Sequence, residues 1–514
     1  MSAQSFLYGT VVLLAASIFN RAVGFIYQIF MMRLIKPEGV GLFSMIFPIY
    51  VMVLVLASLG IPVAISKLVA EEMAVNNLPG AYRIFRVSLA IICVSALLFT
   101  ILLVIASPLL VRYLFPNPSV YLCFVTLIPG VLIVSICSAF RGFFQGLQRM
   151  SPTALTQAVE QLVRVTAGLS IAWILLPRGV EYAAVGISLG VVCGELLGFL
   201  FMLYIYLTRR PRFSFQPGVK APPWQLARIF NLGIPVTLTR FVSTALMSLD
   251  ALLIPRRLQF AGMSMSDSTA TYGQFVGIAE ALFFTPGVIT IALATALIPA
   301  VSDAAAQGRI PLVRSRIEEA IRITIVVGSL VAAVFLVLPH ELCQILFGYR
   351  SAGDALLMLA LSGPFLYLQQ TTTGILQGLG RAGIPFKNLL KASVLKILGI
   401  YYLTSIPGFG ILGTALSMGC TYVLMSLLNY RDLKRITGLR IDPAYCVLKP
   451  VLASISAALV MLQLKTVMAP SLLPGFPGLF IYLAGGSFSF FLVLYIIGGI
   501  SESDVKKMRF IMKR

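Results

Sequence analysis

Residues 142–149 read Gly-Phe-Phe-Gln-Gly-Leu-Gln-Arg, and residues 374–381 read Gly-Ile-Leu-Gln-Gly-Leu-Gly-Arg. A proline follows each copy, at Pro152 and at Pro385. Two further landmarks recur at nearly the same separation: Gly41-Leu42-Phe43 with Gly273-Gln274-Phe275, and Ala64-Ile65-Ser66-Lys67 with Ala300-Val301-Ser302-Asp303. The sequence therefore predicts two copies of one membrane unit, a pattern that in transporters places the substrate site between the copies.

The composition indicates a membrane protein. The chain has 514 residues, of which 59% are hydrophobic and 11% are charged, whereas a soluble domain carries about 25% charged residues. Apolar windows of about 20 residues recur along the chain, and each is long enough to cross a bilayer as a helix. We expect an all-α polytopic fold with about fourteen transmembrane helices. The expected spans are about 7–31, 40–65, 84–107, 121–143, 153–176, 182–207, 229–254, 273–299, 318–338, 355–376, 385–406, 409–430, 447–467 and 479–499.

The spans are expected to form two pseudo-symmetric lobes of six helices each, followed by two more helices. Residues 1–208 make the N-terminal lobe, and residues 229–430 make the C-terminal lobe. A basic linker at 209–228 separates them, and residues 431–514 hold the two additional helices and a basic tail. The first span, near Phe6, is followed by no small-residue cleavage site and is interpreted as a retained helix.

Basic residues predict the orientation. Most of the 39 lysines and arginines fall in the loops on one side of the membrane, which by the positive-inside rule is the cytoplasm. Both termini are then cytoplasmic and the repeats run parallel. The net charge of +21 follows from this topology and from attraction to anionic lipid, so it does not indicate nucleic acid.

Several classes of chemistry are disfavoured. The seven cysteines show no metal-ligand spacing and no disulfide framework. The sequence has no P-loop, no GxSxG and no HExxH motif, which argues against ATP as energy source and against an enzyme. We therefore expect no metal and no cofactor, with transport driven by a gradient of H⁺ or Na⁺ or by the membrane potential.

Two arginines inside predicted spans are candidate substrate-binding residues. Arg21 shares a helix face with Gln28 in the first span, and Arg240 shares one with Thr244 in the seventh. An intramembrane arginine is costly, so it usually faces a wet cavity or a partner. The alternative is that each arginine extends its side chain to the headgroups.

Intramembrane carboxylates form a second group of candidates. Glu160 and Arg164 are spaced i, i+4 and are predicted to form a charge pair. Glu195, Asp250 and Glu280 have no evident local partner and are candidates for coupling to an ion, or for pairing with an arginine across a cavity.

Lys67 and Asp303 are candidates for an inner gate. They end the matching stretches Ala-Ile-Ser-Lys and Ala-Val-Ser-Asp with opposite charges. Opposite charges at a cytoplasmic mouth attract when the lobes close. The alternative is two solvated helix-end charges, since exposed pairs contribute about 0–1 kcal/mol.

Three motifs resemble the stage V sporulation protein B group, in the polysaccharide-transporter branch of the multidrug/oligosaccharidyl-lipid/polysaccharide exporter superfamily. The motifs are Gly60-Ile-Pro-Val-Ala-Ile-Ser-Lys-Leu-Val-Ala-Glu71, Arg141-Gly-Phe-Phe-Gln-Gly146 and Glu160-Gln-Leu-Val-Arg164. The resemblance implies a cavity between two lobes and alternating access by rocking. It also implies transport of an undecaprenyl-linked sugar, such as a peptidoglycan precursor for spore cortex, in the cell membrane of an endospore-forming bacterium. It further implies that Arg21 and Arg240 are cavity arginines.

A flippase for a lipid-linked sugar is the reading we favour, because arginine suits bidentate contacts with pyrophosphate. A multidrug/cation antiporter of the same superfamily is the alternative, followed by a membrane enzyme or a scaffold for cell-wall synthesis. The expected partners are the lipid-linked sugar, membrane lipids and candidate cell-wall synthesis enzymes.

Overall fold

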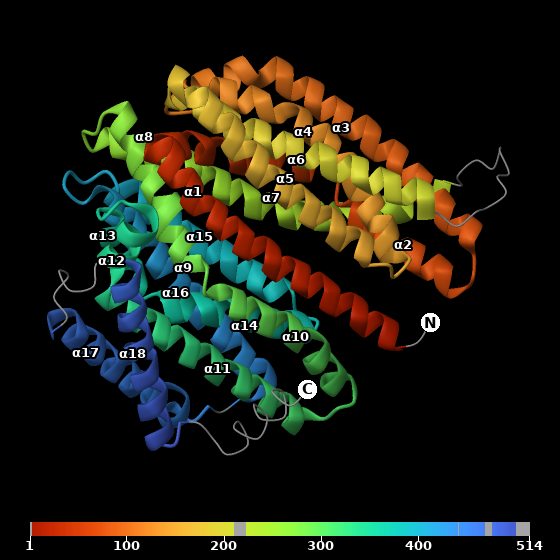
Figure 1. The fold of residues 1–514 in the computed structure, drawn as a ribbon. Coiled ribbons are helices and arrows are strands. Elements are labelled where there is room, and N and C mark those ends of the chain that lie inside the picture. Colours follow the sequence, from red (N-terminus) through yellow and green to blue (C-terminus); the bar gives the residue numbers. More distant parts are fainter. Residues whose placement is uncertain (1–2, 210–222, 440, 468–474, 500–514) are drawn as a thin grey trace. The chain divides into compact units, whose positions relative to one another are not determined.

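The computed structural model describes residues 3–209, 223–439, 441–467 and 475–499, and within them the chain is helical and contains no strand (Figure 1). In this part of the chain, 11 helices are long and apolar enough to cross a membrane. The all-α polytopic fold is thereby confirmed. The number fourteen stays approximate, because some predicted spans are broken and the first two run together.

The chain divides into two compact units, Met1–Gly277 and Ile278–Arg514. The boundary falls inside η2, a π-helix at Phe275–Glu280, and not in the predicted linker 209–228. Residues 210–222 of that linker lie outside the described residues, and a helix already begins at Pro223. The lobes predicted at 1–208 and 229–430 remain a prediction.

Unit 1 holds eight long or medium helices. They are α1 (Ala3–Ser58), α2 (Ile61–Ala74), α3 (Leu78–Leu114), α4 (Val120–Gly146), α5 (Ser151–Leu175), α6 (Val180–Arg209), α7 (Pro223–Phe260) and α8 (Met265–Gln274). A short 3₁₀ turn, η1 (Leu176–Arg178), follows α5. The first two predicted spans form one helix, α1, which is kinked at Lys36 where φ is 59° and ψ is 172°.

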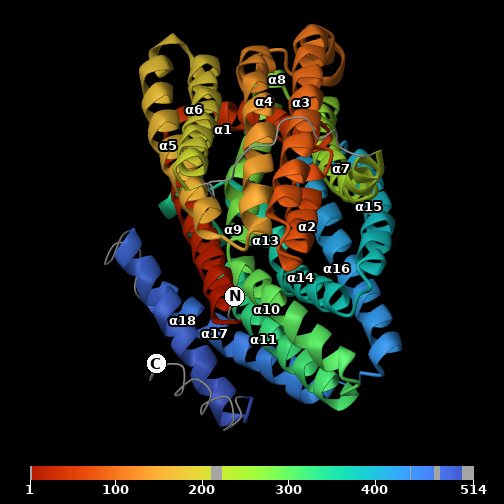
Figure 2. The same cartoon turned by 90° about the vertical axis from the view of Figure 1, so that its right-hand side faces the viewer.

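Glycines on α6 set how closely this helix approaches α5. They recur every fourth residue, so they lie on one face, and the two helices run side by side (Figures 1 and 2). A Cβ at Gly190 would lie 2.2 Å from the Gly168 Cα, and one at Gly194 would lie 2.7 Å from the Glu160 carbonyl oxygen. Such stripes of small residues let membrane helices pack backbone to backbone. The stripe brings Glu160 on α5 next to α6.

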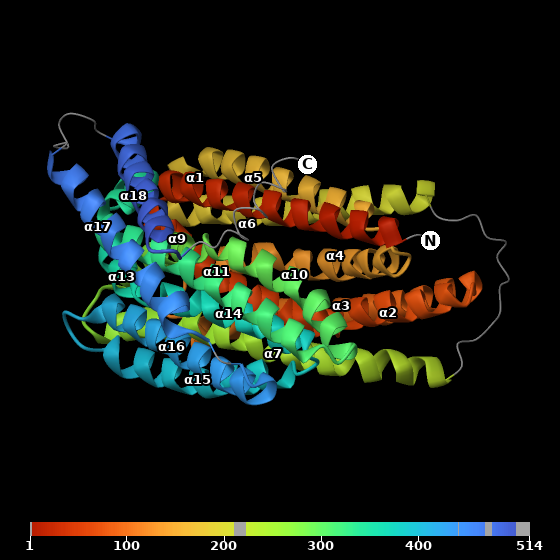
Figure 3. The ribbon, with the colours of Figure 1, turned by 90° about the horizontal axis from the view of Figure 1, so that it is seen from below.

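Unit 2 holds the remaining helices. They are α9 (Ala281–Phe284), α10 (Gly287–Ala306), α11 (Ile310–Val337), α12 (Pro339–Leu342), η3 (Cys343–Phe347), α13 (Ala352–Ala360), α14 (Gly363–Gly378), α15 (Gly383–Leu403), α16 (Gly410–Thr437), η4 (Ala444–Leu448), α17 (Lys449–Val467) and α18 (Phe476–Ile496). Helices α15 and α16 pack side by side (Figure 3). The two extra C-terminal helices, α17 and α18, pack on each other and on α11, and Lys465 Nζ lies 2.7 Å from Glu341 Oε1.

The repeated motif forms the same helix end in both units. The Arg149 N–H donates to the Phe144 carbonyl at 2.9 Å, and the Arg381 N–H donates to the Leu376 carbonyl at 2.9 Å. These are the long-range bonds of a Schellman C-cap, which needs a left-handed residue just beyond the helix. Gln148 supplies it in unit 1 with φ 57°, and Gly380 supplies it in unit 2 with φ 72°.

Glycines of the motif also pack against a matching helix in each unit. A Cβ at Gly142 or Gly146 would lie within 3 Å of a carbonyl oxygen of α2, and one at Gly374 or Gly378 within about 3 Å of a carbonyl oxygen of α10. The contacting pairs are Gly142 with Pro62, Gly146 with Ser66, Gly374 with Ala294, and Gly378 with Ile298. The spacing along the chain is the same in both units, so Ser66 corresponds to Ile298.

This register corrects the argument for the inner gate. If Ser66 corresponds to Ile298, then Lys67 corresponds to Pro299, and Asp303 corresponds to Glu71. Lys67 and Asp303 are therefore not equivalent positions. Short matching stretches of sequence had placed the second landmark one helical turn away from its structural position.

Several predicted spans are interrupted. The span 40–65 breaks at Leu59 and Gly60, where φ is 50° and 59°. The span 273–299 passes through η2 and breaks again at Pro286, before α10. The span 355–376 breaks between α13 and α14. Hydropathy predicts apolar length but is blind to such local breaks, which glycine, proline and π-helical turns produce.

Candidate functional site

A half-buried charge network joins α4 and α5 in unit 1. Glu160 Oε1 lies 2.5 Å from Nη2 of Arg164, its i, i+4 neighbour. Glu160 Oε2 lies 2.6 Å from Nη2 of Arg141 on α4. One carboxylate therefore serves two guanidinium groups, and the trio carries a net positive charge.

Glu195 on α6 adds a carboxyl group beside this trio. It is only 6% exposed, and the Tyr50 hydroxyl on α1 lies 2.9 and 2.8 Å from its two oxygens. Gly130 on α4 makes room for both, because a Cβ there would lie 2.5 Å from Glu195 Oε2 and from the Tyr50 hydroxyl oxygen. Arg164 acts electrostatically on both groups.

The protonation state of Glu195 decides the net charge of this network. With Glu195 ionised, two negative charges would balance the two guanidinium groups, although both guanidinium groups pair with Glu160 and Glu195 is bound by Tyr50. With Glu195 protonated, the network carries one positive charge. A buried charge without a partner is costly, so the two states differ strongly in their interactions with the surroundings.

Three polar atoms in and beside this network lack a hydrogen-bond partner in the described part of the chain. Arg141 Nε, Arg164 Nε and the Tyr27 hydroxyl are buried and have no hydrogen-bond partner among the residues that the structure describes. A Cβ at Gly168 would lie 2.8 Å from the Tyr27 hydroxyl oxygen, so the ring is held close to α5. Buried polar atoms usually find a partner, often an ordered water molecule, so a bound water would satisfy these three.

The polar stripe predicted on α1, which includes Arg21 and Gln28, lies next to other helices of unit 1. Arg21 is exposed, and no ion pair of Arg21 is recorded within the described ranges. Gln28 Nε2 donates to the Gly277 carbonyl at 3.3 Å. A Cβ at Gly24, between them on the stripe, would lie 3.6 Å from Gln161 Nε2 on α5. The stripe therefore adjoins α5 and η2.

The α7 stripe satisfies its own hydroxyl groups. Thr244 Oγ1 donates to the Arg240 carbonyl at 3.0 Å, and Ser248 Oγ donates to the Thr244 carbonyl at 2.9 Å. Arg240 itself is exposed. No contact joins Arg21 to Arg240 in the described part of the chain, so their common role in binding phosphate stays a prediction.

The other candidates are more scattered. Asp250 on α7 and Glu280 in η2 are half-buried, and their role in ion coupling stays a prediction. Lys67 Nζ lies 3.9 Å from Glu71 Oε1, and Asp303 Oδ1 accepts a hydrogen bond from Gln307 Nε2 at 2.8 Å. Each gate candidate therefore has a local partner on its own helix, as expected for the alternative of solvated helix ends.

Helices α1 and α8 meet at two glycines that correspond in the repeat. A Cβ at Gly41 would lie 2.1 Å from the Thr269 carbonyl oxygen, and a Cβ at Gly273 would lie 1.9 Å from the Pro37 carbonyl oxygen. Each glycine thus faces the carbonyl group four residues before the other. Neither position has space for a larger residue.

Sequence reasoning did not single out Tyr50, Arg141 or Gly130 as site residues. Tyr50 and Gly130 look like ordinary span residues, and no periodicity points to them. The glycine spacing on α6 was a usable signal, because Gly186, Gly190, Gly194 and Gly198 surround Glu195 and mark the face that packs on α5.

Comparison with known proteins identifies the relatives of this chain. A family profile described as polysaccharide biosynthesis protein matches residues 6–305, and a second profile, MatE, matches residues 275–402. Stage V sporulation protein B of Bacillus subtilis (strain 168) is 32% identical over 446 residues, which cover 86% of each chain. Lipid II flippase MurJ of the same organism is 29% identical over 215 residues, which cover 40% of this chain and 39% of the flippase.

Solved structures share the fold. An inward closed conformation of Lipid II flippase MurJ matches with a TM-score of 0.73 at 12% identity, covering 95% of this chain and 99% of that one. An inward-facing multidrug resistance MATE family transporter of the MOP superfamily matches with a TM-score of 0.68 at 15% identity, covering 81% of this chain and 94% of that one. At these identities the structures establish the fold.

Proposed function

This chain belongs to the polysaccharide biosynthesis protein family, and from that premise we propose that it is a flippase for an undecaprenyl-pyrophosphate-linked sugar. It is a multi-pass membrane protein of the MOP superfamily, related to transporters and not to enzymes. The observation that carries the proposal is its relation along 86% of its length to stage V sporulation protein B, with a shorter match to a lipid II flippase.

The substrate would be recognised by its pyrophosphate. Arg21 and Arg240 are exposed arginines on long apolar helices, and a guanidinium group can make two parallel hydrogen bonds to a phosphate. Gln28 and Thr244 would add neutral contacts on the same faces. The proposed cargo is a peptidoglycan precursor for spore cortex or a polysaccharide repeat unit, since the relative is a sporulation protein.

Transport would be coupled to protons through Glu195. Protonation of this buried carboxyl group would remove one negative charge beside Arg141 and Arg164, whose ion pairs are both with Glu160. The added positive charge changes the energy of the network, so proton uptake and release can bias the conformation of unit 1. Asp250 and Glu280 are the competing candidates for this coupling, and Na⁺ is the competing ion.

The test uses purified protein in liposomes loaded with lipid-linked sugars, with and without a pH or Na⁺ gradient. We expect flipping of the undecaprenyl-linked substrate and loss of flipping in Arg21→Ala and Arg240→Ala, with partial recovery in the lysine variants. Arg178→Ala, an exposed arginine in η1, is the matched control. Full activity of both alanine variants would rule out the phosphate contacts.

The coupling is tested in the same liposomes. Glu195→Gln should remove the dependence on the pH gradient while Glu181→Gln, an exposed carboxylate on the same helix, keeps it. A pH response that survives in Glu195→Gln would exclude this residue as the proton carrier. Export of a cationic drug in place of the lipid-linked sugar would instead support the antiporter, which the MatE match favours.

A further inference from the structure

A basic pocket lies between α15 and α16 in unit 2. Its volume is about 270 Å³, close to the small end of ligand-binding pockets. Four of its lining residues are cationic and one is anionic. The lining residues are Ile384, Lys387, Asn388, Lys391, Arg431, Asp432, Arg435 and Ile436.

The cations are placed by helical spacing. Lys387 and Lys391 lie one turn apart on α15, and Arg431 and Arg435 lie one turn apart on α16, so each pair shares a helix face. All four are exposed. Two rows of positive charge from neighbouring helices therefore face one space, where they repel each other unless an anion lies between them.

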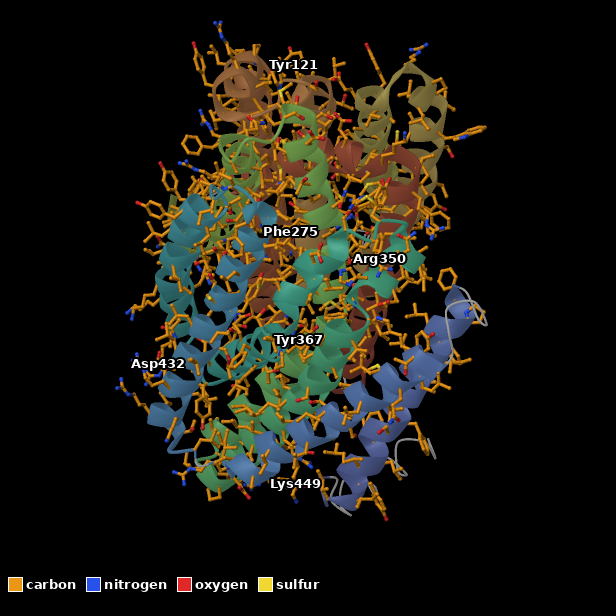
Figure 4. All side chains as sticks on the ribbon, turned by 90° about the vertical axis from the view of Figure 1, so that its left-hand side faces the viewer. Tyr121, Phe275, Arg350, Tyr367, Asp432 and Lys449 are labelled. Carbon is orange, nitrogen blue, oxygen red and sulfur yellow. The ribbon has the colours of Figure 1, made fainter. Side chains whose placement is uncertain are left out.

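The single carboxylate of the pocket is already engaged. Asp432 Oδ2 accepts a hydrogen bond from Asn388 Nδ2 at 3.0 Å, and Oδ1 lies 3.8 Å from Arg431 Nη2. Figure 4 shows Asp432 on α16. One carboxylate cannot neutralise four cations, so the pocket keeps a strong net positive charge.

The floor of the pocket is fixed by a buried amide network. Asn388 is 2% exposed, and its Nδ2 also donates to Asn429 Oδ1 at 3.0 Å. Asn429 Nδ2 donates in turn to Thr373 Oγ1 of α14 at 3.1 Å. Satisfied buried networks of this kind hold side chains rigidly. The four cationic side chains therefore lie around a rigid group of hydrogen-bonded amides.

Apolar side chains continue both charged faces along the helices. On α15, Val394 and Leu398 follow Lys391 at steps of three and four residues and are 58% and 51% exposed. On α16, Leu427 precedes Arg431 by four residues and is 53% exposed. A surface that is cationic at one end and apolar beyond it matches a phospholipid, with its phosphate among the cations and its acyl chains on the apolar side chains.

We propose that the pocket between α15 and α16 binds the phosphate headgroup of an anionic phospholipid. Basic pockets between membrane helices on the cytoplasmic side recognise such headgroups. A free phosphate ion would use the same cations but would gain nothing from Val394, Leu398 and Leu427. The site does not depend on what the protein transports.

The test measures binding of fluorescent phosphatidylglycerol to the purified full-length protein in a neutral detergent. Unlabelled phosphatidylglycerol, phosphatidylcholine and inorganic phosphate serve as competitors. The pocket variant is Lys387→Gln with Arg431→Gln, one cation from each helix. The matched control is Arg381→Gln with Lys434→Gln, two exposed cations near the same helices but outside the pocket.

We expect the pocket variant to bind phosphatidylglycerol about tenfold to thirtyfold more weakly, and the control variant to bind it as wild type does. Equal binding by both variants would overturn the proposal. Displacement by inorganic phosphate at the concentration at which phosphatidylglycerol itself competes would overturn the lipid assignment.

A second measurement protects the test against a misfolded variant. The wild-type protein is labelled with a photoactivatable phosphatidylglycerol whose reactive group is in the acyl chain, and labelled peptides are identified by mass spectrometry. Labelling should concentrate in residues 394–398 and around Leu427. Labelling spread evenly over exposed apolar helix faces would contradict a specific site.

Discussion

Units 1 and 2 contain the same helix end but surround it with different polar groups. Arg141 precedes Gly142 in unit 1 and joins the charge network of Glu160, whereas Thr373 precedes Gly374 in unit 2 and joins the amide network of Asn429. Backbone contacts at the glycines are preserved in both. The comparison shows that backbone packing was retained while the adjoining side chain became ionic in one copy and neutral in the other.

The largest expected difference in stability is between a variant of the charge network, at Glu160, and a variant of the amide network, at Thr373. Glu160→Gln should destabilise the protein by about 3 kcal/mol, because Arg141 and Arg164 both lose their carboxylate partner. Thr373→Val should cost about 1–2 kcal/mol, because the Thr373 hydroxyl accepts two neutral hydrogen bonds, from Asn429 Nδ2 at 3.1 Å and from Gln369 Nε2 at 3.3 Å. Thermal unfolding of both variants in the same detergent measures the contrast. Equal losses would show that water screens the charges of unit 1.

Two buried tyrosines allow a finer version of the comparison. The Tyr50 hydroxyl binds the Glu195 carboxyl group, whereas the Tyr367 hydroxyl donates to the Phe283 carbonyl at 2.9 Å (Figure 4 labels Tyr367). Where Glu195 is ionised, Tyr50→Phe should cost about 1 kcal/mol more than Tyr367→Phe, since hydrogen bonds to charged groups are stronger; where Glu195 is protonated, the two losses should be similar. Thermal unfolding of both variants at low and at high pH measures the two losses, and a difference that does not change with pH would contradict a Tyr50 bond that depends on the charge of Glu195.

Helix pairs α5–α6 and α15–α16 differ in what limits their approach. A Cβ at Gly190 would meet the Gly168 backbone at 2.2 Å, while one at Gly399 would meet the Ser417 side chain at 2.5 Å. Gly190→Ala should therefore cost about 2 kcal/mol, and Gly399→Ala less, because a side chain can move. Gly383→Ala, with nothing within 4 Å, is the control. The free energy of unfolding in detergent and urea reports all three.

The smallest expected effects come from the two C-caps. Gln148 has φ 57°, a conformation that glycine adopts without strain, so Gln148→Gly should stabilise unit 1 by about 0.5–1 kcal/mol. Gly380→Ala should destabilise unit 2 by about 1 kcal/mol for the same reason. Opposite shifts of the melting temperature are the expected readout. Shifts of the same sign would show that the caps are not equivalent.

The sequence predicted the features that depend on the length of apolar segments, on the repetition of a motif and on the spacing of charged residues along a helix. Apolar windows predicted the helical membrane fold, the duplicated motif predicted a repeat, and i, i+4 spacing placed Glu160 beside Arg164. The sequence did not predict contacts between helices that are far apart along the chain. Arg141 meets Glu160 only because α4 packs next to α5, and Tyr50 meets Glu195 only because Gly130 leaves space. The register error at Asp303 arose because a short match of small apolar residues can slip by one helical turn.

The contact between Gly41 and Gly273 has an evolutionary consequence. In a twofold-symmetric dimer a residue on the axis faces its own copy, so a single mutation strikes both sides of the interface. Gly41 and Gly273 keep this mutual arrangement inside one chain, where each faces the carbonyl group four residues before the other. Because both glycines belong to one chain, a mutation at one position leaves the other unchanged. One side of this contact can therefore change while the other stays glycine, which a symmetric dimer of identical chains does not allow.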